Sequence, residues 1–250
     1  MAPGALTWLG HATTLVEVGG ARVLTDPVLR GRIAHLRRHA PAPAAPRALD
    51  AILVSHLHRD HLDLPSLRAL DPAVPVIVPR GAAPVLGRAR RRDVREVDVG
   101  DAVEIGDGLR VLAVDADHDP RRSPFERRAR ALGYIVEAGG RRVYFAGDTA
   151  LFAGMADLPA LDAALLPVWG YGPTMGPGHM DPEQAAEALT LLRPRLAVPI
   201  HWGTFLPLGL RGRHGHVLQT PGPSFAARAA ELAPEVRVVV AAPGERVDFD

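Results

Sequence analysis

The sequence predicts a single α/β domain over residues 1–250. Strand-length apolar runs alternate with turns and helical segments along the chain. Four predicted buried strands, which begin near residues 51, 109, 142 and 196, are each followed closely by histidine or aspartate. Because polar side chains at the ends of buried strands need partners, we expect the four ends to converge. Convergence favours one domain, whereas the length alone allows one or two.

The first third of the chain is predicted to consist of short strands. We expect strands at residues 5–9, 13–18 and 22–25, with Gly19 and Gly20 forming a hairpin turn between the last two. Residues 28–47 are rich in arginine and proline without clear periodicity, which predicts a long loop or partial helix. His35 and His39 within that segment are expected to be solvated.

The rest of the chain continues the alternation. Strands are predicted at residues 51–55, 74–78, 94–97, 102–105, 109–116, 132–137, 142–146, 161–168, 195–200 and 236–241. Helices are predicted at residues 64–70, 81–92, 182–192 and 224–232. The third helix has the clearest signal, with Asp181 as N-cap, Pro182 at the first helical position and Glu183 in the first turn. The arginine-rich segment 121–130 and the residues around His214 and His216 are expected to be loops.

Composition narrows the class of function. The 47% hydrophobic content excludes disorder, and the net charge of +1 gives no reason to expect a nucleic-acid partner. The chain has no cysteine, so a metal site would have to use histidine and carboxylate ligands. It also has no lysine, so arginine occupies every position that lysine or arginine could fill. Any single arginine is therefore weaker evidence of a functional role. No leader peptide and no apolar run of 18 residues is evident, so we expect a cytoplasmic protein without a transmembrane segment.

The segment AILVSHLHRDH, residues 51–61, is the strongest functional signal. It places His56, His58, Asp60 and His61 in one loop directly after a buried strand. Residues two apart in an extended segment point to the same side, so His56 and His58 can hold one cation while Asp60 and His61 face a second. A solvated polar turn is the alternative, but it does not explain three imidazoles and a carboxylate at the edge of an apolar strand.

Three later strand ends carry matching residues. His118 follows the strand at 109–116 and is a candidate third nitrogen for the first metal, and Asp148 in Gly-Asp-Thr follows the strand at 142–146. A carboxylate can bridge two cations, so Asp148 is the candidate bridge. His201 stands at the end of the strand at 195–200. His11 and Asp26 also occur at strand ends, where turn residues are the more common explanation.

These motifs together resemble the metallo-β-lactamase superfamily. The resemblance rests on SHLHRDH, on His118, on FAGDT around Asp148 and on PIHWGTF around His201. It implies a four-layer αββα sandwich, in which two mixed sheets face each other and helices cover the outer faces. The segments WLGHATTLVEVGGARVLTDP, GHMDPEQAAEA and IHWGTF are similar to the branch that includes N-acyl phosphatidylethanolamine phospholipase D and the ascorbate 6-phosphate lactonases.

The resemblance assigns a role to each matching residue. It implies that one metal is held by His56, His58 and His118, the other by Asp60, His61 and His201, and both by Asp148. It implies that Asp60, Asp148 and His179 belong to the catalytic centre, that His11 and His179 line the substrate pocket, and that Asp26 orients the metal loop. Arg122, in the loop just after His118, is a candidate substrate contact.

We therefore expect a hydrolase that uses a hydroxide bridging two divalent ions. Zinc suits the His/Asp ligand set best, with manganese or iron as alternatives. Phosphodiesters or phospholipid-like esters are the expected substrates, and lactones or cyclic amides are the alternative. A non-catalytic ligand-binding domain is a further alternative, but it would be expected to lose ligands, and all seven are present. The sequence predicts no oligomeric state.

Overall fold

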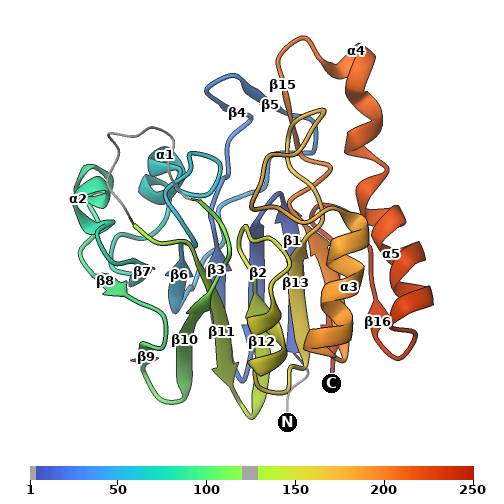
Figure 1. The fold of residues 1–250 in the computed structure, drawn as a ribbon. Coiled ribbons are helices and arrows are strands. Elements are labelled where there is room, and N and C mark those ends of the chain that lie inside the picture. Colours follow the sequence, from blue (N-terminus) through green and yellow to red (C-terminus); the bar gives the residue numbers. More distant parts are fainter. Residues whose placement is uncertain (1–3, 120–128) are drawn as a thin grey trace.

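The computed structural model describes residues 4–119 and 129–250, apart from the side chain of Arg88. Arg122 and most of the arginine-rich segment 121–130 lie outside the described residues. Two seven-stranded mixed sheets form the body of the fold. The helices α1 and α2 lie on one side of the sheets, and α3 and α5 lie on the other (Figure 1). This is the four-layer αββα sandwich that the sequence predicts.

The first sheet has the strand order β17-β1-β2-β3-β6-β7-β8. Its strands are β1 (Gly4–Gly10), β2 (Thr13–Val18), β3 (Ala21–Thr25), β6 (Ala51–Leu53), β7 (Val76–Pro79), β8 (Val94–Val97) and β17 (Arg246–Phe249). Pairing is antiparallel from β17 to β3 and parallel from β3 to β8. The last strand, β17, was not predicted: the expected strand at 236–241 is reduced to two residues, and the chain forms β17 beyond it.

The second sheet has the order β16-β14-β13-β12-β11-β10-β9. Its strands are β9 (Ala102–Ile105), β10 (Leu109–Asp115), β11 (Leu132–Ala138), β12 (Arg141–Phe145), β13 (Ala163–Pro167), β14 (Leu196–Ile200) and β16 (Arg237–Val238). Pairing is antiparallel from β9 to β12 and parallel from β12 to β16. Each sheet therefore changes from antiparallel to parallel pairing in the middle.

A small third sheet corrects the prediction for residues 28–47. It consists of β4 (Arg32–Ile33), β5 (Leu36–Arg38) and β15 (Phe205–Pro207) in the order β15-β5-β4. Residues 32–38 form a hairpin because Ile33 and Leu36 are buried with Val28 and Phe205 in a separate apolar cluster. Residues 39–47 contain no helix or strand, as a long loop predicts. The strand that completes the sheet comes from far along the chain, so no local pattern reveals it.

The helices agree with the prediction best where the capping signal is clear. They are α1 (Leu64–Arg68), α2 (Ala83–Leu86), η1 (Gly87–Ala89), η2 (Ala153–Asp157), α3 (Pro182–Leu192), α4 (Arg211–His214), η3 (Gly215–Leu218) and α5 (Pro221–Leu232), where η marks a 3₁₀ turn. Asp181 and Gln184 form a reciprocal capping box at the start of α3. None of the helices among the described residues is long and apolar enough to cross a membrane.

One predicted helix and one predicted loop were wrong. The expected helix at residues 81–92 breaks into α2 and the turn η1, which ends at Arg90 in the left-handed conformation. His214 and His216 lie in α4 and η3 rather than in an irregular loop.

The central core lies between the sheets, and alternation along each strand divides the apolar residues between two clusters. In β3, Val23 faces the central core, while Leu24 faces a second cluster with residues of α1 and α2. In β6, Leu53 and Ile52 divide in the same way. Because β6 ends at Leu53, the predicted metal loop leaves the sheet from a strand that is buried on both faces.

Candidate metal centre

Residues from five separate segments meet at one edge of the two sheets. The loop after β6 supplies His56, His58, Asp60 and His61; His118 follows β10, Asp148 follows β12, His201 follows β14, and His11 lies between β1 and β2. They form two clusters, in each of which one potential ligand atom per residue lies within 4.8 Å of the others. The first cluster is His56, His58, His118 and Asp148, and the second is His11, Asp60, His61 and His201. All seven predicted ligands are thus brought together.

The first cluster has nitrogen and oxygen atoms that lack hydrogen-bond partners. His118 donates from Nδ1 to the carbonyl oxygen of Gly178 at 2.8 Å, which leaves the Nε2 lone pair directed at Nδ1 of His58, 3.3 Å away. Nε2 of His56 and Oδ1 of Asp148 are buried without a hydrogen bond to any described residue. Buried polar atoms of this kind normally have partners, so a cation fits this cluster.

The second cluster also has nitrogen atoms that face each other and could bind a cation. His61 donates from Nδ1 to Asp26, at 2.6 Å, and His201 donates from Nδ1 to the carbonyl oxygen of Trp169, at 2.8 Å. In the tautomer that has its proton on Nδ1, each ring carries a lone pair on Nε2, and these two atoms lie 3.0 Å apart. Two lone pairs at this distance repel, whereas a divalent cation accepts both. Oδ2 of Asp60 lies 3.7 Å from each of the two nitrogens.

Asp148 lies between the two clusters. Its Oδ2 is 3.1 Å from Nε2 of His61, and its Oδ1 is 3.1 Å from Nε2 of His201, although both histidines belong to the second cluster. Gly147 allows this position, because its φ of +63° is left-handed and an added Cβ would lie 2.6 Å from Cβ of Ser55. Its Oδ2 also lies 3.8 Å from Nε2 of His56, so the carboxylate is close to residues of both clusters.

Asp26 fixes the direction of the metal loop. Its carboxylate accepts from the backbone N–H of Ser55 at 2.7 Å, from Oγ of Ser55 at 2.6 Å and from Nδ1 of His61 at 2.6 Å. This last bond sets the tautomer of His61 and presents its Nε2 to the cluster, which is the usual task of a carboxylate behind a metal-ligating histidine.

His11 is placed differently from the expectation. Its side chain is only 1% exposed, so the ring does not line an open pocket. Instead, Nε2 of His11 lies 3.0 Å from Oδ2 of Asp60, and the backbone N–H of His11 donates to Oγ1 of Thr204. His11 therefore lies behind Asp60 and can orient its carboxylate, and it is close enough to serve as a ligand in the second cluster.

Backbone strain coincides with this centre. His11, Asp26 and His201 all have positive φ angles, of 55°, 32° and 62°, a region that is uncommon for residues other than glycine, although histidine and aspartate adopt it more often than most. His201 donates its backbone N–H to the carbonyl oxygen of His11 at 2.9 Å, which ties two of the strained residues together. Strain of this kind persists where the surrounding structure holds a functional geometry in place.

Burial lowers the pKa of four imidazoles at the centre, those of His11, His56, His58 and His118. It lowers the pKa of His58 to about 4 and the pKa of His11 to about 3, and it lowers that of His56 well below its usual value. At His61 burial acts in the same direction, but Asp148, Asp26 and Asp60 outweigh it and raise the pKa well above its usual value. Burial would raise the pKa of Asp148, but His201 and His61 hold it well below its usual value. Neutral imidazoles and carboxylates form the donor set that divalent transition metals bind.

His179 lies on the open side of the centre. Its side chain is 20% exposed, and its Nε2 lies 3.3 Å from Oδ2 of Asp148. The carbonyl oxygens of Gly176 and Pro177 lie 3.3 and 3.2 Å from its Nδ1. Burial lowers the pKa of His179, but the hydrogen bond with Asp148 outweighs it, so that the pKa is raised. Neither ligand cluster includes this residue.

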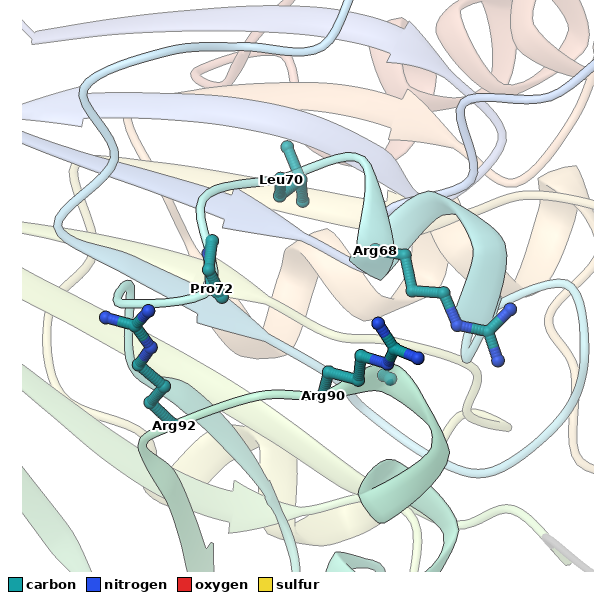
Figure 2. Close-up of a pocket in the computed structure, with 6 residues that line it drawn as sticks. Arg68, Leu70, Pro72, Arg90 and Arg92 are labelled. Atoms are coloured by element: carbon teal, nitrogen blue, oxygen red, sulfur yellow. The ribbon is translucent and has the colours of Figure 1, made fainter.

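A cavity of about 390 Å³ opens beside the two clusters, with His58 and Asp60 in its wall. Its other lining residues are Ile33, Ala34, His35, Leu36, Arg59 and Tyr171. No local pattern predicts this cavity, because its wall includes the hairpin β4–β5, which lies in the segment where a loop or partial helix was expected. A separate hollow, with Arg68 on α1, Leu70 and Pro72 after it and Arg90 and Arg92 on the facing segment, contains none of the cluster residues (Figure 2).

The chain is similar to proteins of one family. Residues 21–202, more than half of the chain, match the family described as the beta-lactamase superfamily domain. A UPF0173 metal-dependent hydrolase from Methanopyrus kandleri is 34% identical over 96% of this chain and 97% of its own length. An N-acyl-phosphatidylethanolamine-hydrolyzing phospholipase D from Caenorhabditis elegans is 33% identical over 81% of this chain, which corresponds to 64% of that enzyme.

The solved structures agree with this match. A metallo hydrolase from Ignicoccus hospitalis superposes with a TM-score of 0.75 at 26% identity, covering 100% of this chain and 99% of the other. The shared fold, the paired His/Asp clusters and the sequence matches lead to one conclusion: the chain belongs to the metallo-β-lactamase superfamily and is a metal-dependent hydrolase.

Proposed function

We propose that the protein is a dinuclear hydrolase of phosphodiesters or phospholipid-like esters. In this proposal His56, His58 and His118 hold one divalent ion, Asp60, His61 and His201 hold the other, and Asp148 contacts both. Zinc is the proposed metal, because the clusters offer imidazole nitrogens and carboxylate oxygens and the chain has no thiolate.

The observation that carries the proposal is the position of Asp148 between the clusters. Its two oxygens lie 3.1 Å from His61 and 3.1 Å from His201 on the side of the second cluster, and the same residue completes the first. A pair of divalent ions bound here would make water acidic enough to ionise near neutral pH and would neutralise negative charge on the group under attack.

The residues of the chain then have distinct tasks. Asp26 and the carbonyl oxygens of Gly178 and Trp169 hold the rings of His61, His118 and His201 by Nδ1, so that each Nε2 points inward. His11 holds Asp60 through Nε2. Because these contacts exist before substrate binds, little reorganisation is needed during the reaction.

His179 is the proposed proton donor. It faces the open side of the centre, is partly exposed, and is held by Asp148 and by two backbone carbonyl oxygens. A histidine in this place can give a proton from Nε2 to the departing oxygen or donate a hydrogen bond to the oxygen that gains charge. The hydrogen bond with Asp148 raises the pKa of His179 and so favours the protonated form of this histidine.

Hydrolysis at phosphorus is preferred over hydrolysis at carbon. Two ions can share the charge that a phosphoryl transition state spreads over several oxygens. The similarity to a phospholipase D from Caenorhabditis elegans, at 33% identity, supports the same choice. Arg122 stays a proposed phosphate contact on the sequence alone, since it lies outside the described residues.

A matched substrate panel tests this proposal. Protein loaded with zinc or manganese is assayed against methyl 4-nitrophenyl phosphate, 4-nitrophenyl phosphate and simple lactones, with the His56→Ala variant as the control for metal dependence. We expect the highest kcat/KM for the diester and loss of all turnover in the control. A kcat/KM for a lactone well above that for the diester would show that hydrolysis at carbon is the reaction. An unchanged diester turnover in Arg122→Ala would show that Arg122 does not contact the phosphate.

A further inference from the structure

The cavity beside the metal clusters is walled by a braced hairpin. β5 pairs with β15, and Ile33 and Leu36 are buried with Val28 and Phe205. Arg38 donates to backbone carbonyl oxygens of Leu9, Val28 and Pro41 and lies over the ring of Phe205. The wall is therefore held at its base by pairing, by apolar packing and by a half-buried guanidinium.

The opposite wall is held by the metal centre itself. Tyr171 lies in the segment between β13 and α3, packs against the same apolar cluster, and meets the ring of His35 edge to face at a centroid distance of 6.2 Å. Trp169, two residues earlier, accepts the Nδ1 hydrogen of His201 at 2.8 Å, and its own ring donates to the carbonyl oxygen of Gly172. The position of Tyr171 is thus linked to a ligand residue of the second cluster.

The lining is apolar and aromatic except toward the clusters. Ile33, Ala34, Leu36 and Tyr171 form one part of the surface, and His58 and Asp60 form the end that joins the metal centre. Arg59 also contributes and is exposed. A volume of about 390 Å³ lies at the low end of the range for small-molecule sites, so the cavity suits one compact group rather than a long chain.

We infer that this cavity binds a compact apolar group, of the size of an aryl ring or a short branched alkyl group, on the part of the substrate that does not react. The inference rests on the proposed function, because it places the reacting ester at His58 and Asp60 and the apolar group against the wall that Ala34, Leu36 and Tyr171 form. The substrate class is then a diester with one apolar substituent. A substrate polar along its whole length would leave Ile33 and Leu36 facing groups that prefer water.

Binding of product-like phosphonates tests the inference without requiring turnover. The affinities of phenylphosphonate and methylphosphonate for the zinc-loaded full chain are measured by titration calorimetry. We expect phenylphosphonate to bind at least tenfold more tightly, because its ring is removed from water in the cavity. Equal affinities, or no measurable binding of either ligand, would overturn the inference.

Substitutions of lining residues test which side chains cause the preference for the phenyl group. Tyr171→Ala should lower the phenyl-to-methyl affinity ratio at least fivefold, and His35→Ala, which removes an exposed ring, should lower it in the same direction. Tyr171→Phe keeps the ring and should keep the ratio, as should Leu208→Ala, a control whose side chain is 46% exposed and does not line the cavity. An unchanged ratio in both Tyr171→Ala and His35→Ala would overturn the assignment.

The test separates the two proposals. If the affinity ratio is as expected while no diester is hydrolysed, the reaction class is wrong and the apolar site stands. If methyl 4-nitrophenyl phosphate is hydrolysed while the two phosphonates bind equally, the reaction class stands and the apolar site is overturned. Zinc content and melting temperature, measured for each variant, identify changes that come from the metal centre or the fold.

Discussion

Replacement of Asp26 by asparagine tests how the second metal site is organised. The carboxylate accepts three hydrogen bonds, two from Ser55 and one from His61, and it is fully buried. Asparagine keeps the size and one acceptor oxygen but replaces the other oxygen with an amide that donates. His61 can then pair with this amide only by accepting at Nδ1, which moves its proton to Nε2, the atom that faces the second cluster.

The expected effect follows from this change of tautomer. Loss of such a partner typically weakens metal binding about 10–100-fold, or about 1.4–2.7 kcal/mol. The charge-assisted bonds lost in the metal-free protein should lower its free energy of unfolding by about 1–3 kcal/mol. Stepwise metal titration against a competing chelator gives the two affinities separately, and denaturant unfolding of the metal-free protein gives its stability.

A matched control distinguishes the tautomer effect from general damage. Asp63 is also buried, but it caps α1 and pairs with Arg30 away from the clusters. Asp63→Asn should lower the stability of the metal-free protein without changing either metal affinity. If Asp26→Asn binds both metals as tightly as the wild type does, the proposed role of Asp26 is refuted.

Three further predictions concern the centre. The wild type should bind about two metals per chain by elemental analysis, and Asp148→Ala one or fewer, because the residue between the clusters is lost. His201→Ala should lose about one metal, whereas His179→Ala should keep both and lower turnover by about 10²–10⁴-fold, as expected for a proton donor. Gly147→Ala should lower the free energy of unfolding by about 1–3 kcal/mol in thermal or denaturant melts, because a Cβ would meet Ser55.

Contrary results would be informative. One metal or none in wild-type protein reconstituted with zinc and manganese would contradict a dinuclear site, and full metal retention in Asp148→Ala would contradict its place between two ions. Equal metal loss in His201→Ala and His179→Ala would make His179 a ligand. A Gly147→Ala variant as stable as the wild type would show that the backbone there can relax.

The sequence predicted the parts of the site that lie at strand ends. His56, His58, Asp60 and His61 are close together in the chain, and the change from an apolar strand to polar residues marks them without further information. Asp148 and His118 follow the same rule on other strands. His201 was noted at a strand end in the same way, and its assignment as a ligand gained weight from the family resemblance.

The parts that were missed depend on contacts between distant segments. β4 and β5 have too few residues for a visible period, and they are stabilised by β15, which no local pattern reveals. His11 was expected in an open pocket, but its place behind Asp60 depends on how β1 and the loop after β6 meet. The sequence does not mark Tyr171 as a residue of the cavity wall, since a single tyrosine in a glycine-rich segment fits many structural positions.

The distribution of ligands over both sheets connects metal binding with the assembly of the sandwich. His56, Asp60 and His61 follow a strand of the first sheet, whereas His118, Asp148 and His201 follow strands of the second. In the proposed dinuclear site, ions held jointly by these residues would bind only after the two sheets have packed together, so they would stabilise the assembled state by mass action. Free metal at about a hundred times its dissociation constant would add about 2.7 kcal/mol for one site. If the site is occupied as proposed, the metal supply would set the fraction of chains that unfold, and hence the exposure of the chain to proteolysis.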